Sequence, residues 1–331
     1  MNLHHLRIFH TVANRQSVTR AAADLLLTQP AVSVQLKALE KELGLPLFER
    51  GGQKLRLTQA GEVLHRAAVS ILSAVDEAER AIAELRGGTK GRLILGAGTT
   101  GGMYVLPRVI QAYKSLWPET EILLHVGTTD QILEKLFQNV LDMGLVGGPI
   151  EDRRFTVDTL CGDELVLIAA PSHPIASLGK VTLRDLGGMP FIVPETGSRT
   201  RQLVEKRLRE AGVPLAIAMQ LPGTEGVKRA VEGGLGIGMV SRYAVESEVG
   251  AGVLRRVPIE GWQLRRSMNL VYRAQKYFSP VGARFRQFAL SYGAQHLDPV
   301  ATPADRRARP RAVRPAHRAT RKGERQTLGR T

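Results

Sequence analysis

The segment around residue 98 combines glycine and threonine in a spacing that suits ligand binding. Gly96-Xaa-Gly98-Xaa-Xaa-Gly101 follows an expected strand over 92–97 and precedes an expected helix over 103–116. In formal terms this is a dinucleotide fingerprint in the strand-to-helix context that such a site requires. Backbone N–H groups and hydroxyls at a helix N-terminus also form a site for a small anion.

The strand that follows argues against the dinucleotide. A nicotinamide dinucleotide would need a carboxylate at the end of that strand to hold a ribose hydroxyl. The expected strand over 121–126 ends instead in Gly127, Thr128 and Thr129, and Asp130 falls in the next turn. A small-anion site is therefore the favoured interpretation, and no cofactor is expected.

Polar helix starts of the same kind recur downstream. Segments 128–129, 195–200 and 223–226 each precede an expected helix. Each one alone is more simply a helix cap. Four of them on one α/β sheet favour a shared cleft, because ligands bind outside the carboxyl ends of parallel strands. The residues expected to line it are Thr99, Thr100, Gly101, Thr128, Thr129, Ser198, Arg199, Thr200, Thr224 and Glu225.

Residue types for catalysis or metal binding have little usable context. Cys161 is the single cysteine, so it cannot form an internal disulfide or hold a zinc ion by itself. An oxidised Cys161 would also lack a second cysteine to resolve it. His125 and His173 lack the neighbours expected of ligands or general bases. We expect neither a metal site nor an enzyme.

The elements that must position the cleft lie within residues 91–293. Short β-branched runs alternate there with helical patterns, which is typical of an α/β domain with a mainly parallel sheet. A late strand over 270–272 and a helix over 279–292 would return the chain to the first half. We expect two lobes, one over about 91–160 and 268–293 and the other over about 161–267.

Residues 1–59 predict a helical domain with short turns. Ser17 is a good cap for a second helix, and Thr28 or Gln29 caps a third that carries Pro30 in its first turn. In the third helix, one apolar stripe must face the core: Val32, Leu36, Leu39 and Leu43. The opposite stripe is small near the N-terminus and basic further on, as a helix in a DNA major groove requires. A surface helix with a few lysines is the alternative.

A winged segment after the third helix strengthens the DNA interpretation. Residues 45–50 and 54–58 flank the turn Gly51-Gly52, although an ordinary solvated hairpin would have the same pattern. A winged helix-turn-helix is therefore predicted for the all-α N-terminal domain. Its expected DNA contacts are Ser17, Thr19, Arg20, Thr28, Gln29, Pro30, Ser33, Val34, Lys37, Arg50, Lys54 and Arg56.

One long helical pattern follows and ends at Gly87-Gly88, within a linker over 60–90. Its apolar residues recur at spacings of four and three, which favours a two-helix seam over a helix packed on its own domain. A dimer would read a DNA site with two-fold symmetry. The expected seam is Leu64, Ala68, Ile71, Val75, Ala78, Ile82 and Leu85.

The charge of the chain is basic and uneven. The net charge is +15, and residues 294–331 alone hold ten Arg or Lys against three acidic residues. That Arg-, Pro- and Ala-rich stretch is expected to be a disordered tail. A basic balance favours polyanionic partners such as double-stranded DNA. No apolar run approaches the ~20 residues of a membrane span, and no secretory signal is visible, so a cytoplasmic location without membrane contact is expected.

The N-terminal motifs resemble the signature of the LysR-type transcriptional regulators. The matching residues are Ser17-Val18-Thr19-Arg20-Ala21-Ala22, Leu27-Thr28-Gln29-Pro30-Ala31-Val32-Ser33, Gln35, Leu39-Glu40, Leu43-Gly44, Leu47-Phe48-Glu49-Arg50, Leu57-Thr58, Ala60 and Gly61. The resemblance implies that Thr28, Gln29, Pro30, Ser33 and Lys37 face the DNA. It also implies paired linker helices, dimers that assemble into tetramers, and contact with RNA polymerase.

The later motifs are similar to the effector domain of the same family. That domain has the fold of type 2 periplasmic binding proteins, with ligand between its lobes. Segments 98–100, 142–149 and 224–231 resemble the branch that regulates sulfur assimilation and carbon fixation, which implies a small anionic metabolite. Arg199 departs from the glycine usual in its loop, so it either adds a cation near the pocket or blocks part of it.

Three functional classes are therefore considered for this chain. A ligand-controlled transcription factor accounts for both the N-terminal motifs and the cleft. A transport-type solute-binding protein would share the second domain, but the helix-turn-helix argues against it. An NAD-dependent enzyme would need the carboxylate that the second strand lacks.

Overall fold

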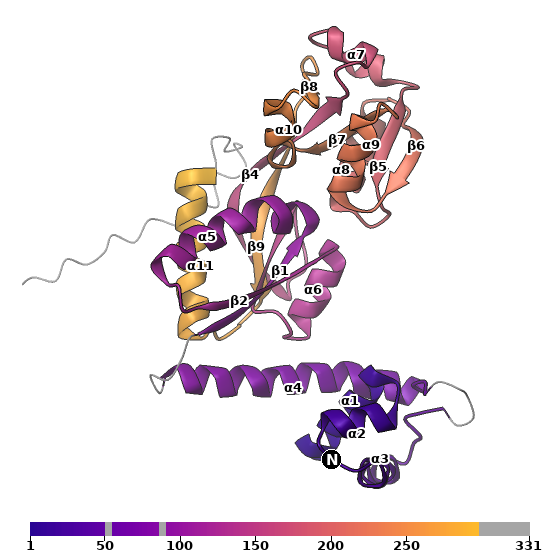
Figure 1. The fold of residues 1–331 in the computed structure, drawn as a ribbon, viewed down its shortest axis with the longest axis vertical. Coiled ribbons are helices and arrows are strands. Elements are labelled where there is room, and N and C mark those ends of the chain that lie inside the picture. The colour runs from indigo at the N-terminus through magenta and orange to yellow at the C-terminus, as the bar shows by residue number, and fades with distance from the viewer. Residues whose placement is uncertain (50–54, 86–90, 298–331) are drawn as a thin grey trace, which may run out of the picture.

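The computed structural model describes residues 1–49, 55–85 and 91–297, with the side chains of Glu84 and Leu85 excepted. Three parts follow each other along the chain (Figure 1). A helical domain is followed by one long helix, and that helix runs beneath a larger α/β domain. No helix among these residues is both long and apolar enough to cross a membrane.

The N-terminal domain consists of α1 (Leu3–Arg15), α2 (Val18–Asp24) and α3 (Gln29–Leu43). Both expected caps form, because the side chain of Ser17 accepts from Arg20 N and that of Thr28 accepts from Ala31 N. Beyond α3, Phe48 and Leu57 pair in antiparallel fashion, as expected for the base of a wing.

The core of this domain contains most of the predicted apolar stripe of α3. Val32, Leu36 and Leu39 are buried with Phe9 from α1. The prediction for Leu43 is wrong, since that side chain is 38% exposed. It lies in the last turn, directly before Gly44, whose left-handed conformation ends the helix.

The long helix α4 (Gln59–Leu85) serves two structural purposes. Its first half packs on the N-terminal helical domain, where Ala68 and Leu72 are buried and Leu64 is partly buried. The predicted seam is therefore wrong for Leu64 and Ala68, because both help to form the core of their own domain. Further along, Ile71, Ala78 and Ile82 are exposed and Val75 is half-buried.

The α/β domain is built on one nine-stranded sheet with the order β2-β1-β3-β9-β4-β7-β5-β6, and β8 pairs with β4. Its strands are β1 (Arg92–Gly98), β2 (Glu121–Gly127), β3 (Met143–Gly147), β4 (Phe155–Ala169), β5 (Pro190–Pro194), β6 (Ala216–Leu221), β7 (Ile237–Ser241), β8 (Arg255–Val257) and β9 (Leu264–Arg273). Each end of the sheet contains parallel pairs, whereas the central strands β4 and β9 are antiparallel.

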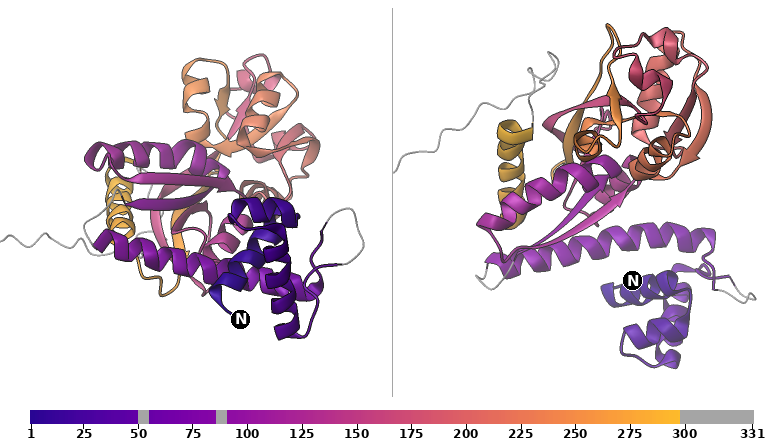
Figure 2. Two further views of the ribbon diagram at one scale, coloured as in Figure 1. Left: turned by 60° about the horizontal axis from the view of Figure 1, so that its bottom comes forward. Right: turned by 45° about the horizontal axis from the view of Figure 1, so that its top comes forward.

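The helices pack against this sheet in two groups (Figure 2). They are η1 (Gly101–Val105), α5 (Leu106–Leu116), α6 (Thr129–Phe137), α7 (Pro174–Ser177), η2 (Leu183–Leu186), α8 (Arg199–Glu210), α9 (Gly223–Glu232), η3 (Arg242–Ala244), α10 (Glu246–Gly250), α11 (Pro280–Tyr292) and η4 (Gly293–Leu297).

Two lobes result, because β4 and β9 pass from one hydrophobic core to another. On β4 the core changes between Cys161 and Leu165, and on β9 it changes between Leu264 and Met268. The two long strands are therefore the connection between the lobes. Any movement of one lobe against the other must bend or twist them.

The start of the predicted disordered tail needs correction. Residues 294–297 belong to η4, and Leu297 is buried in the core of the first lobe. The hydroxyl of Tyr243 donates to the carbonyl of Leu297, which anchors this end of the chain. The basic residues from 298 onward lie outside the described part of the chain.

Two histidines stack between the first helix and the linker helix. The rings of His10 on α1 and His65 on α4 are 5.2 Å apart and nearly parallel. Burial lowers the pKa of both; His65 lowers that of His10 further, and Asp76 raises it. The contact therefore favours two neutral rings.

We predict that this contact makes the helical domain sensitive to acid. Because both pKa values are lowered in the folded state, the unfolded chain binds more protons below about pH 6.5. The stability that the neutral pair contributes is complete above that pH and is lost as the pH falls. Amide exchange in α1 and α4, corrected for its intrinsic pH dependence, should accelerate between pH 8 and pH 5.5, and less so in His65→Gln. An equal acceleration in both proteins would contradict this.

Candidate effector pocket and DNA-reading helix

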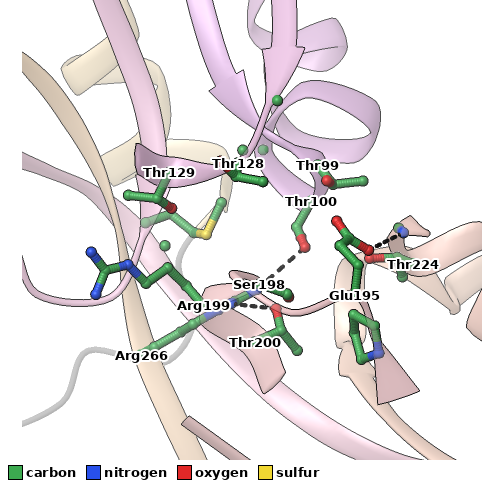
Figure 3. Close-up of a pocket in the computed structure, with 17 residues that line it drawn as sticks. Thr99, Thr100, Thr128, Thr129, Glu195, Ser198, Arg199, Thr200, Thr224 and Arg266 are labelled. Atoms are coloured by element: carbon green, nitrogen blue, oxygen red, sulfur yellow. Dashed lines mark hydrogen bonds between the residues drawn. The ribbon is translucent and has the colours of Figure 1, made fainter. Parts of the chain in front are cut away.

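A cavity of about 40 Å³ lies between the two lobes, where loops from both converge (Figure 3). Its lining is Gly98, Thr99, Thr100, Gly101, Gly127, Thr128, Thr129, Gly147, Pro194, Glu195, Ser198, Arg199, Thr200, Gly223, Thr224, Arg266 and Met268. Nine of the ten residues predicted for the cleft are among them. The structure thus brings together four loops that are far apart in the sequence.

Helix starts supply much of this lining. Thr128 caps α6 in a capping box with Gln131, and Ser198 caps α8 by accepting from Arg201 N. On the opposite side of the cavity, the carboxylate of Glu195 accepts from Gly223 N at the start of α9, at 2.5 Å. The positive ends of α6 and α8 therefore meet at the cavity and favour a negatively charged occupant, whereas the start of α9 is already compensated by the Glu195 carboxylate.

Arg266 lines the cavity, although no sequence motif predicted it. It lies on β9 and is 7% exposed, and its Nε donates to Asp163 at 2.8 Å. Its Nη1 donates to Thr200 at 2.9 Å and its Nη2 to Thr100 at 3.4 Å, so one guanidinium bridges both lobes. A guanidinium has five N–H donors, and two of these have no acceptor among the described residues.

Arg199 also crosses from one lobe to the other. Its Nη2 donates to Asp130 on α6 at 3.1 Å, and Arg199 also lines the cavity. Its Nε is buried and has no hydrogen-bond partner among the described residues. Arg199 therefore places a cation at the cavity, which agrees with the first of the two alternatives from the sequence.

The prediction for Glu225 is wrong, because its side chain turns away from the cavity that the preceding Thr224 lines. Glu225 accepts from the hydroxyl of Tyr104 in the first lobe and from Lys228 Nζ, the latter at 2.7 Å. Lys228 is also 2.5 Å from Glu248. Burial and the bond to Glu225 raise the pKa of Tyr104 to about 12. The sequence could not distinguish this contact between the lobes from a ligand contact.

The predicted DNA-reading face of α3 is open to solvent. Val34 is 63% exposed, Lys37 is exposed, and Gln29 Nε2 donates to Ser33 Oγ at 3.2 Å. Thr19 and Arg20 on α2 are exposed beside it. The hydroxyls of Ser17 and Thr28 are used as caps, so these residues position the helices as well as border the face.

The wing prediction is only partly covered by the described residues. Arg56 is exposed, and its carbonyl accepts from Glu49 N at 2.9 Å. Arg50 and Lys54 lie outside the described residues, so their role in DNA contact stays a prediction. Cys161 is buried, and no group of three or more potential metal ligands occurs among the described residues.

Comparison with known proteins assigns both parts of the chain to a family. Residues 3–62 match the family described as bacterial regulatory helix-turn-helix protein, lysR family, and residues 86–294 match the LysR substrate binding domain. The transcriptional activator CmpR of Synechocystis is 35% identical over 290 residues, which cover 88% of this chain and 95% of CmpR. The RuBisCO operon transcriptional regulator of Allochromatium vinosum is 35% identical over 295 residues, 89% of this chain and 97% of its own.

A solved structure gives the same result for the α/β domain. The regulatory domain of CcmR from Synechocystis PCC6803, in complex with 2-PG, has a TM-score of 0.59 and 26% identity. The match covers 62% of this chain and 99% of that domain. A helix-turn-helix reader joined to a two-lobed binding domain defines a ligand-responsive DNA-binding protein. The chain belongs to the LysR family of bacterial transcriptional regulators.

We predict that Ser33→Arg abolishes operator-specific binding. The small side chain of Ser33 leaves room for close approach to base edges, and a guanidinium there would hold α3 away from the groove. Specific affinity should fall toward the non-specific level, by about 10³-fold or more, in a footprinting titration at fixed salt. Ser33→Ala, which keeps the space open, should lose far less. Normal footprints with Ser33→Arg, in a folded oligomer, would contradict the role of α3.

Proposed function

We propose that this LysR-type regulator controls genes of carbon fixation in response to a small anionic metabolite, carrying carboxylate or phosphate, bound between its lobes. The observation that carries the proposal is the guanidinium of Arg266 at the floor of the cavity. It is fixed by Asp163 and donates to Thr100 in one lobe and to Thr200 in the other. A ligand that uses its remaining donors would hold both lobes at once.

The electrostatics of the cavity support an anion of small size. Asp163 compensates the charge of Arg266, and Asp130 compensates that of Arg199. The two arginines therefore give the cavity no large net positive charge. An anion would instead be bound by N–H groups, hydroxyls and the buried Nε of Arg199. A cavity of about 40 Å³ favours a small anion over a dinucleotide.

The relatives support the choice of genes and of ligand chemistry. CmpR is named as a transcriptional activator, and the relative from Allochromatium vinosum is named for the RuBisCO operon. The regulatory domain of CcmR holds 2-PG, which we take as 2-phosphoglycolate, a small molecule with carboxylate and phosphate groups. By the same reasoning we propose that the chain acts in the cytoplasm, contacts RNA polymerase and needs neither catalysis nor a cofactor.

We predict that Thr100→Val combined with Thr224→Val weakens binding of 2-phosphoglycolate at least tenfold. Two hydroxyls that line the cavity are replaced by methyl groups of similar shape, so hydrogen bonds to a charged ligand are lost at about 1.5–3 kcal/mol each. Calorimetry measures the affinity, and operator binding without ligand should stay unchanged. Thr156→Val on β4, outside the cavity, serves as the control. Wild-type affinity in the double variant would place the ligand elsewhere.

We also propose that α4 pairs with α4 of a second copy. The exposed apolar residues Ile71, Ala78 and Ile82 support this, and Ile82 is 51% exposed. Leu64 and Ala68 contribute only indirectly, through the domain core that they share with the start of α4. A dimer places two copies of α3 on one DNA site, and two dimers would form the expected tetramer.

We predict that Ile82→Asp weakens this pairing by roughly tenfold or more, because burial of an isoleucine side chain is worth about 1.5–3 kcal/mol. Sedimentation equilibrium measures the dissociation constant. Ala83→Asp introduces the same charge about 100° further around the helix and should have little effect. Equal effects of the two substitutions would contradict the proposed seam.

A further inference from the structure

A cluster of buried polar side chains joins the linker helix to the effector domain at a distance from the effector cavity. We call Glu77, Asn139, Asp142 and Lys276 the linker cluster. Lys276 Nζ is 2.6 Å from Glu77 on α4, 3.2 Å from Asn139 Oδ1 and 3.6 Å from Asp142. Asn139 in turn donates to the other carboxylate oxygen of Glu77 at 2.5 Å.

Because Lys276 is buried, its ammonium group needs charged or polar partners. Its side chain is 3% exposed, and a buried ammonium group is costly unless it is paired. If α4 moved away, Glu77 would be removed and the balance of charge around Lys276 would change. Lys276 would then keep Asp142 as its charged partner, at 3.6 Å.

Apolar packing does not hold the two parts together at this place. A cavity of about 310 Å³ borders the contact, and Ala74, Ala78 and Ala81 of α4 line its side. Tyr277, on the opposite side, is 76% exposed. Small side chains of α4 border this cavity, so the polar bonds of the linker cluster are direct side-chain contacts between α4 and the first lobe, below which α4 lies (Figure 1).

Two neighbouring strands, β9 and β3, connect the linker cluster to the effector cavity. Strand β9 carries Arg266 and Met268 at the cavity and leads, after Arg273, to Lys276. Asp142 immediately precedes β3, which ends at Gly147 in the cavity lining. The strands are antiparallel neighbours, with Gly147 opposite Met268. A ligand that moves Arg266 along or around β9 thus acts on strands whose other ends hold Lys276 and Asp142.

We propose that Glu77 and Lys276 form an interdomain latch that transmits the state of the effector cavity to the linker helix. The proposal rests on the proposed function for the identity of the ligand, but not for the existence of the latch. Ligand binding changes the strain on β9 and β3, and the linker cluster opens or closes in response. Because α4 is continuous with the core of the DNA-binding domain through Ala68 and Leu72, its reorientation resets the position of α3.

The test uses the full-length oligomer with Glu77→Gln, Lys276→Met and the double variant. Glu79→Gln removes the same charge from an exposed position of α4 and serves as the control. Without ligand, amide exchange over 74–81 and 274–277 should rise at least fivefold in both single variants, and not in the control. Amide exchange in the double variant should be no faster than in the single variants, because the two residues act as one contact.

With 2-phosphoglycolate, calorimetry should give an affinity within about twofold of wild type for Glu79→Gln. The latch variants should still bind the ligand but with a shifted affinity, because a latch whose state depends on the ligand must in turn affect the affinity for that ligand. The ligand-dependent change in operator affinity should fall at least fivefold in the latch variants and remain in Glu79→Gln. Unchanged exchange in both single variants overturns the latch, as does a ligand response of full size. If the wild type does not bind 2-phosphoglycolate, the proposed ligand fails, and the exchange measurements without ligand still decide the latch.

Discussion

The ion pair between Arg266 and Asp163 is the interaction on which the effector domain depends. Both side chains are almost fully buried at the point where β4 and β9 cross between the lobes. Removal of one partner of such a pair typically costs about 3–5 kcal/mol, because the other charge is left without compensation. The pair therefore fixes the guanidinium, and the guanidinium fixes Thr100 and Thr200 across the cleft. A ligand meets donors that are already in place, so little of its binding energy is lost to ordering them.

Patterns with strong local signals were predictable from the sequence. The caps at Ser17 and Thr28 determine where α2 and α3 begin, and both form as expected. The threonine-rich helix starts also converge on one cavity, because parallel strands bring their carboxyl ends to the same edge. Glu225 failed as a prediction because its position in the first turn of α9 does not determine where its side chain points. The prediction for Leu43 is wrong because a residue in the last turn of a helix can lie outside the core that the rest of the helix packs against.

Contacts between segments far apart in the sequence could not be predicted. Arg266 stands in a strand with several other arginines, and only the pairing of β4 with β9 places it beside Asp163. Lys276 likewise meets Glu77 only through the packing of α4 on the first lobe, which brings together residues far apart in the sequence. The heptad over 64–85 shows which residues share one face of the helix, but a periodicity does not show what that face packs against. The first part of that face packs on the domain's own core, and the later part stays exposed.

The central claim is that the cavity and the DNA-reading helix are energetically coupled within one chain. The most direct test measures the affinity for 2-phosphoglycolate by calorimetry, with the free protein and with the protein saturated by its operator. Linkage requires the ligand and the DNA to change each other's affinity by the same factor, typically about 5–150-fold for an allosteric protein. The account predicts a difference in this range between the two titrations. Equal affinities in the two titrations would contradict it.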